Sequence, residues 1–250
     1  MKFAEQQLRD WSQPAEKSSL TPDVISWVTN TLSALDAPHR VVLSGSAANR
    51  TATHNSDLDI QVVFGTPALP TLQQKRLLRD YKFQIAHKLA REVGTSATED
   101  ANKCLKIAMG RVSVDVLPAW ASDNETSIRF WTGEGRETIN NSFWYRQSSN
   151  AKDLATNGAF RESVLIAKST GKHLGTKASS YAMERSVWAV PAAEFEADTV
   201  RERMRRVGAH IIGNDSTEFH ATMNQLEVPG IPVSDYQAAI RTWRTIVAHL

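Results

Sequence analysis

The sequence lacks the features that would place the protein outside an ordinary globular class. A single cysteine, Cys104, stands among its 250 residues, which excludes an internal disulfide framework and a metal site built from several thiolates. No apolar run is long enough to cross a bilayer, and the polar N-terminal stretch MKFAEQQLRDWSQPAEKSS lacks the apolar core of a signal peptide. We therefore expect a cytoplasmic protein without membrane contact.

A strong excess of charge of either sign is also missing. Lys and Arg number 29 against 27 Asp and Glu, a formal net charge of +2, which is far from the basic excess of a dedicated duplex-DNA binder. One stretch, RERMRRVGAH, is locally basic and sets Arg201 and Arg205 one helical turn apart. It is interpreted either as a solvated helix face or as a binding surface for RNA or another polyanion.

Hydrophobic periodicity divides the chain into a mixed half and a helical half. The elements predicted for the first half are a helix over 20–35, a strand over 40–45, a strand over 58–64, a helix over 71–93 and a hairpin over 103–120 that turns at Met109-Gly110 and ends at Pro118. Residues 121–158 are polar and predict loops and short elements, and the pattern from 159 onward predicts helices. The fold expected is α/β (α+β), with a small mixed sheet in residues 1–135 and a helical domain in residues 136–250.

Two carboxylates follow one another in the strand-like stretch SDLDIQVVF. Side chains two apart in a strand share a face, so Asp57 and Asp59 are expected to point away from the buried side of Leu58 and Ile60. A desolvated charge in a strand is costly unless a cation or another partner offsets it. This pair therefore predicts a cation site.

A third carboxylate has the same setting in VSVDVLPAW, where Asp115 alternates with valines. Three carboxylates from adjacent strands would provide the oxygen ligands that Mg²⁺ or Mn²⁺ prefers, and a pair of such ions clamps the two oxygens of a phosphoryl transfer. Upstream, Gly45-Ser46 can form a tight turn whose hydroxyl and backbone N–H groups bind phosphate oxygens. We predict that Asp57, Asp59 and Asp115 are catalytic and metal-binding.

The ordered set GSAANRTATHNSDLDI and VSVDVLPAW resembles the nucleotidyltransferases of the DNA-polymerase-β superfamily. Within it, the sequence is most similar to the branch of cyclic GMP–AMP synthase, the oligoadenylate synthases and the bacterial CD-NTases, with archaeal-type CCA-adding enzymes as near neighbours. The resemblance implies a polymerase-β-like core in residues 1–135 and a C-terminal helical domain.

The same resemblance implies roles for further residues. Thr51 matches the threonine that follows the Gly-Ser pair in this branch, and Lys168 matches its helical lysine. Ser180-Tyr181 matches the Ser-Tyr pair that begins the next helix, so Lys168 and Ser180 would hold the β- and γ-phosphates while Tyr181 stacks on the base. A solvated lysine and a core tyrosine are the alternative interpretations.

The function that the resemblance implies is template-independent transfer of a nucleoside monophosphate from a nucleoside triphosphate to a hydroxyl, with release of pyrophosphate. Its products would be cyclic or linear oligonucleotide second messengers, as in antiviral defence. Transfer to an RNA 3′ end or to another macromolecule or small molecule is the alternative. A binding module without catalysis would not need three carboxylates.

Overall fold

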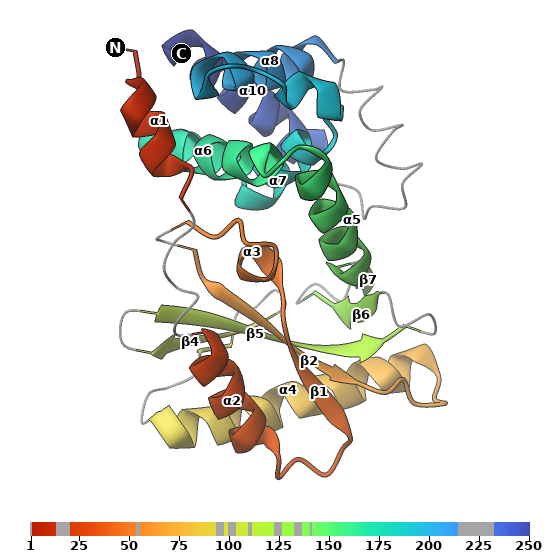
Figure 1. The fold of residues 1–250 in the computed structure, drawn as a ribbon. Helices are drawn as coiled ribbons and strands as arrows, with labels where there is room; N and C mark the ends of the chain where they lie inside the picture. Colours follow the sequence, from red (N-terminus) through yellow and green to blue (C-terminus); the bar gives the residue numbers. More distant parts are fainter. Residues whose placement is uncertain are drawn as a thin grey trace. The chain divides into compact units, whose positions relative to one another are not determined.

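The computed structural model describes the chain in ten stretches: residues 2–13, 21–53, 56–93, 98–99, 104–109, 112–122, 127–132, 137–140, 142–214 and 233–250. The chain forms two compact units, each built from segments that are not contiguous in sequence (Figure 1). The sheet unit comprises Glu16–Asn49 and Asn55–Trp144, and the helical unit comprises Met1–Ala15, Arg50–His54 and Tyr145–Leu250.

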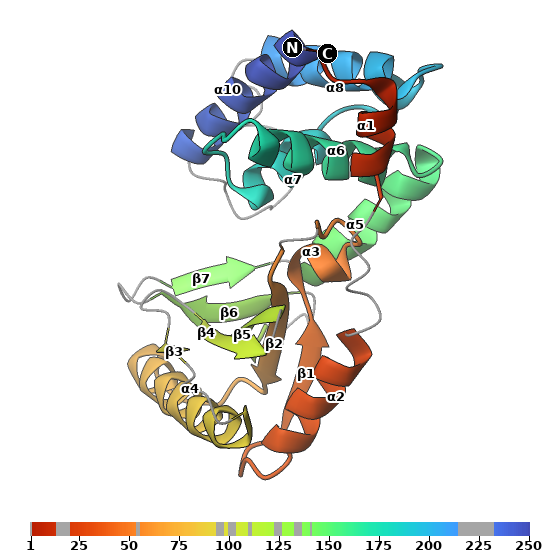
Figure 2. The same cartoon turned by 90° about the vertical axis from the view of Figure 1, so that its left-hand side faces the viewer.

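The described strands of the sheet unit form one mixed, seven-stranded sheet. They are β1 (His39–Leu43), β2 (Leu58–Phe64), β3 (Thr98–Glu99), β4 (Leu105–Met109), β5 (Val112–Ala121), β6 (Ile128–Trp131) and β7 (Glu137–Asn140). The order is β1-β2-β5-β4-β3, and β6 pairs with β5 and β7. β2 and β5 run parallel at the centre, whereas β1 on β2 and β4 on β5 are antiparallel (Figure 2).

Two amphipathic helices, α2 (Thr21–Leu32) and α4 (Thr71–Val93), cover one face of this sheet (Figures 1 and 2). Alternate strand residues point toward them, so that Ile60 and Val116 are fully buried and pack in one core with Ile85 of α4. The intervening residues, which include Asp59 and Asp115, stand on the opposite face. The predicted helix over 71–93 and strand over 58–64 are confirmed at those bounds.

Two expectations for the chain before residue 159 were wrong. Pro118 does not end its strand, because β5 continues to Ala121. Among the described residues, β4 pairs with β5 only as far as Val116 and β6 pairs only from Trp120, so residue 118 pairs there with β2 alone. A missing N–H is tolerated where no second strand needs it.

The second correction concerns residues 121–158. Besides the short strands β6 and β7, this stretch holds a full helix, α5 (Ser142–Ala155), where only loops and short elements were expected. Its sequence, SFWYRQSSNAKDLA, holds the run Ser148-Ser149-Asn150, residue types that favour turns, so helical periodicity is hard to recognise there.

The helical unit confirms the helices expected after residue 159. Its further elements are α1 (Glu5–Trp11), α6 (Ala159–His173), α7 (Ser180–Trp188), the 3-10 turn η2 (Ala192–Phe195), α8 (Val200–Gly213) and α10 (Val233–His249). Trp243 of α10 is fully buried and donates from Nε1 to the Ser186 hydroxyl at 3.0 Å. No helix in the described stretches is at once long and apolar enough to span a bilayer.

Candidate active site

Asp59 and Asp115 are direct neighbours across the two central strands. The β2–β5 register pairs Asp59 with Asp115, and the β4–β5 register pairs Asp115 with Lys106. Residues matched in register present their side chains on the same face. The sheet therefore aligns two carboxylates and one ammonium group in a row across β2, β5 and β4.

The Asp115 carboxylate is contacted at both oxygens. Lys106 Nζ lies 3.8 Å from Oδ1, and the Cys104 thiol donates to Oδ2 at 3.6 Å. Cys104 is buried, as expected for an inert thiol. Lys106 therefore faces the same side of the sheet as Asp115.

Gly45 lies against the Asp59 side chain. It begins the one-turn helix α3 (Gly45–Ala48) with φ +60, and a Cβ atom placed on it would be 1.9 Å from Asp59 Oδ2. The preceding residue fixes this approach, because the Ser44 N–H donates to the Asp59 carbonyl at 2.8 Å. The predicted phosphate turn, Gly45-Ser46, is thus in contact with the second predicted carboxylate.

Asp57 is placed differently from the other two carboxylates. It is exposed and lies one residue before β2, where strand alternation no longer determines its direction. Among the described residues, no group of three or more His, Cys, Asp or Glu side chains is gathered closely enough to hold a metal ion. The donor type, carboxylate oxygen, fits Mg²⁺, and the Asp59–Asp115 pair would supply two of the three expected ligands.

Thr51 and Lys168 meet at a buried carboxylate that the sequence did not single out. Lys168 Nζ donates to the Thr51 carbonyl at 2.7 Å, and the Thr51 hydroxyl donates to Glu184 Oε2 at 2.7 Å. Lys168 Nζ also lies 3.7 Å from that oxygen. Lys168 is therefore not a solvated helix residue, and a direct contact with phosphate would require this ion pair to rearrange.

Ser180 and Tyr181 begin α7 as predicted, after Ser179, whose hydroxyl accepts from the Ala182 N–H at 3.1 Å. Tyr181 is 41% exposed, which excludes the core alternative and leaves its ring available for stacking. Behind it, the buried Arg185 guanidinium lies 4.9 Å from the Tyr181 ring centroid and 3.2 Å from that of Tyr145. Burial, followed by the nearby Glu184 charge, raises the pKa of the Tyr145 hydroxyl well above its ordinary value.

The basic residues of α8 contact the chain itself. Arg201 donates to the Phe3 carbonyl and Arg205 to the Leu250 carbonyl, both at 2.6 Å. These contacts give both side chains a structural role, and a polyanion at this face stays a prediction.

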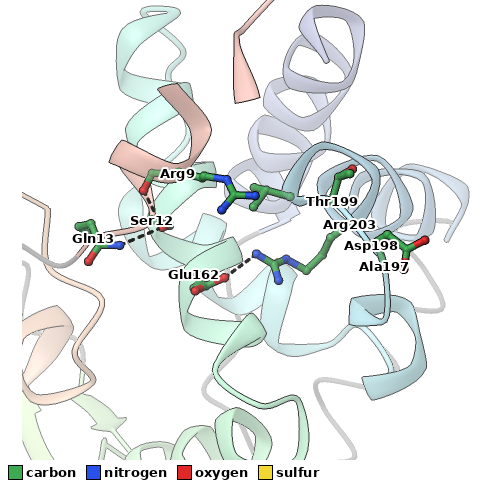
Figure 3. A pocket seen from close by; sticks show the side chains of 9 residues that line it. Arg9, Ser12, Gln13, Glu162, Ala197, Asp198, Thr199 and Arg203 are labelled. Atoms are coloured by element: carbon green, nitrogen blue, oxygen red, sulfur yellow. Dashed lines mark hydrogen bonds and ion pairs between the residues drawn. The ribbon is translucent and has the colours of Figure 1, made fainter. Parts of the chain in front are cut away.

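A cavity of about 270 Å³ lies within the helical unit, and none of the predicted site residues lines it (Figure 3). Arg203 points into it and donates to Glu162 at 2.5 Å, so these two charges are matched. The adjacent start of α8 is capped by Thr199 and by Glu5, whose carboxylate accepts from the Val200 N–H at 2.9 Å. We assign this cavity no catalytic role.

The site is thus two neighbouring carboxylates beside a glycine turn on a mixed sheet, the arrangement expected of a nucleotidyltransferase of the polymerase-β-like class. Residues 147–231 match the family model of the cGAS/DncV-like nucleotidyltransferase C-terminal helical domain. A cyclic dipurine nucleotide synthase of Elizabethkingia meningoseptica is 26% identical over 246 aligned positions, covering 83% of each chain.

Solved structures show the same fold. The CdnE cyclic dinucleotide synthase of Elizabethkingia meningoseptica, solved with GTP and Apcpp, matches with a TM-score of 0.75 and 22% identity over 97% of both chains. The Rhodothermus marinus CdnE c-UMP-AMP synthase, solved with Apcpp and Upnpp, matches with a TM-score of 0.76 and 20% identity over 97% of this chain and 95% of that one. These likenesses support placing the chain in the CD-NTase branch of the polymerase-β-like nucleotidyltransferases.

Proposed function

We propose that this chain is a template-independent nucleotidyltransferase that joins nucleoside triphosphates into cyclic or linear oligonucleotide second messengers. The observation that supports it most is the contact of Gly45 with Asp59, beside Asp115 in the adjacent strand. A phosphate turn and two carboxylates then share one end of a sheet, and the C-terminal residues match the family's helical domain.

In the proposed reaction, a ribose hydroxyl attacks the α-phosphorus, the bond to the bridging oxygen of the β-phosphate breaks, and pyrophosphate leaves. Gly45 and Ser46 receive the triphosphate, and the exposed Tyr181 ring stacks on a base, a contact worth about 1–3 kcal/mol. Asp115 accepts the proton of the attacking hydroxyl. Mg²⁺, held by Asp57, Asp59 and Asp115, would supply neutralisation of the phosphate charge.

We propose ATP and GTP as the first substrates to test. The curated relative at 26% identity is a cyclic dipurine nucleotide synthase, which favours two purines. A structural neighbour of the same fold makes a mixed uracil–adenine product, so the fold alone does not fix the bases. Stacking on Tyr181 tolerates any base and leaves that choice to other side chains. A messenger of this kind fits a role in antiviral defence, which the loss of phage protection in an Asp59→Asn strain would test.

The deciding experiment incubates the protein with the four triphosphates, singly and in pairs, with Mg²⁺ and no acceptor. We expect pyrophosphate release and new phosphatase-resistant oligonucleotides, with the ATP and GTP pair giving the highest yield. Asp59→Asn and Asp115→Asn should each abolish product while leaving the unfolding midpoint close to that of the wild type.

Two outcomes would overturn the proposal. If no product formed until an RNA 3′ end or another acceptor was added, the chain would belong to the alternative class of transferases. Binding of triphosphates without turnover under any of these conditions would indicate a nucleotide-binding module.

A further inference from the structure

Glu184 lies inside the helical unit, where its contacts include a loop residue and a lysine. Its side chain is 8% exposed and that of Lys168 is 2% exposed. Oε2 accepts from the Thr51 hydroxyl at 2.7 Å and lies 3.7 Å from Lys168 Nζ. Lys168 in turn donates to the Thr51 carbonyl at 2.7 Å, so Thr51 is held by both its side chain and its backbone.

The segment that these contacts hold has an unusual course. Residues 50–53 belong to the helical unit, although the chain on either side of them, at Gly45-Ser46 and at Asp57, belongs to the sheet unit. Arg50 begins the segment with φ +58, a left-handed conformation that is uncommon for a residue other than glycine. Such conformations persist only where the surrounding structure imposes them.

The charges of the cluster are matched. A buried carboxylate is tolerated when a cation and hydrogen-bond donors satisfy it, and Glu184 has both in Lys168 and Thr51. Replacing Glu184 with a neutral apolar residue would leave the Lys168 ammonium buried without its counter-charge and would release the Thr51 hydroxyl. Neither loss removes a group from the Asp59 or Asp115 side chain.

We propose that Glu184 is a positioning residue: by joining Lys168 to Thr51 it fixes residues 50–53, which connect the phosphate turn at Gly45-Ser46 with Asp57. This inference rests on the proposed function for its effect on turnover, but its effect on the loop is independent of any activity. It also assigns Lys168 a role in holding the loop, whereas the phosphate contact that the family resemblance implies would require the Lys168–Glu184 pair to rearrange.

The test combines hydrogen exchange with kinetics on the full chain. Glu184→Ala is expected to increase amide exchange at residues 51–53 at least tenfold and to lower kcat at least tenfold at saturating triphosphate. Glu184→Gln keeps an oxygen for the Thr51 hydroxyl but loses the charge, so it should recover part of both losses. Thr51→Val removes the hydroxyl that donates to Glu184 and keeps the Lys168–Glu184 pair, which provides a milder variant should Glu184→Ala fail to fold.

A matched control is available in the same unit. Asp153 forms a partly buried ion pair with Arg161 at 2.7 Å, with both side chains 15% exposed. Asp153→Asn should lower stability without changing exchange at residues 51–53 or kcat.

Unchanged exchange at residues 51–53 in Glu184→Gln and Thr51→Val would overturn the inference, as would a kcat loss in Asp153→Asn equal to that in Glu184→Ala. Inactivity of the wild type with every triphosphate would instead overturn the proposed function, and the exchange measurement would still decide the role of Glu184 in the loop.

Discussion

Gly45 stands where any larger residue would displace a carboxylate. A Cβ atom there would lie 1.9 Å from Asp59 Oδ2, and real Cβ atoms essentially never approach a heavy atom closer than 3.0 Å. Asp59 would have to move by about 1 Å, a displacement that can cost about 10²-fold in rate. We therefore expect Gly45→Ala to lower kcat/KM about 10²-fold, measured by pyrophosphate release.

The control for this prediction is Gly175→Ala. Gly175 has a similar left-handed backbone, φ +63, but nothing lies within 4 Å of its missing Cβ. Both variants should lose about 1–2 kcal/mol of stability from the backbone conformation alone. Equal activity in the two variants would mean that the contact between Gly45 and Asp59 has no part in turnover.

The residues that could be predicted from the sequence are those whose neighbours define a pattern. Asp59 and Asp115 alternate with apolar residues in strands, and the register confirms that they are adjacent. Glu184 and Arg185 could not be found in this way. They lie in SYAMERSVW as ordinary charged helix residues, and only tertiary packing reveals that both are buried.

Among the elements, the end of α7 depends on a lysine that comes from another helix. Lys152 of α5 donates to the carbonyls of Trp188 and Val190, and burial lowers its pKa from the ordinary 10.5 to about 8. Between these two pH values the unfolded chain binds a proton that the folded chain does not. The contribution of Lys152 to the free energy of unfolding therefore rises with pH across this window.

The pH dependence can be measured by chemical denaturation between pH 7.5 and 10 on the wild type and on Lys152→Met. A neutral amine keeps two N–H groups, so both carbonyls can still be satisfied above pH 8. We expect the wild type to gain stability relative to the variant as pH rises. If the free energy of unfolding changed with pH in the same way in both proteins, or if the wild type lost stability relative to the variant, the lowered pKa of Lys152 would be contradicted.

The elements that were predicted correctly have strong periodicity, such as the strand 58–64 and the helix 71–93. Those that were missed depend on neighbours in the fold. α5 is polar in sequence and is fixed by contacts such as those of Lys152. Pro118 is allowed inside β5 because no described strand pairs with it on the side opposite β2.

The whole molecule consists of two units, each with its own core. Local sequence patterns do not indicate that residues 50–53 join the helical unit, because this depends on burying Thr51 against Lys168 and Glu184. Non-local contacts of this kind decide which segments form a unit and are invisible to periodicity.

Binding of a nucleoside triphosphate at the site should raise the free energy of unfolding of the whole chain. A ligand that binds only the folded state at 100 times its Kd adds about 2.7 kcal/mol to the free energy of unfolding. For a chain of this length, each kcal/mol raises the midpoint by about 2–4 °C. We expect a non-hydrolysable ATP analogue with Mg²⁺ to raise the thermal midpoint by about 5–10 °C.

This stabilisation should depend on the carboxylates. Asp59→Asn with Asp115→Asn removes two ligands of the expected Mg²⁺ site, so the part of the shift that Mg²⁺ adds over EDTA should disappear, whereas Asp153→Asn should keep it. A shift that is equal with Mg²⁺ and EDTA in the wild type would mean that the triphosphate binds without a cation, and the two aspartates would then need another explanation for sharing one face of the sheet.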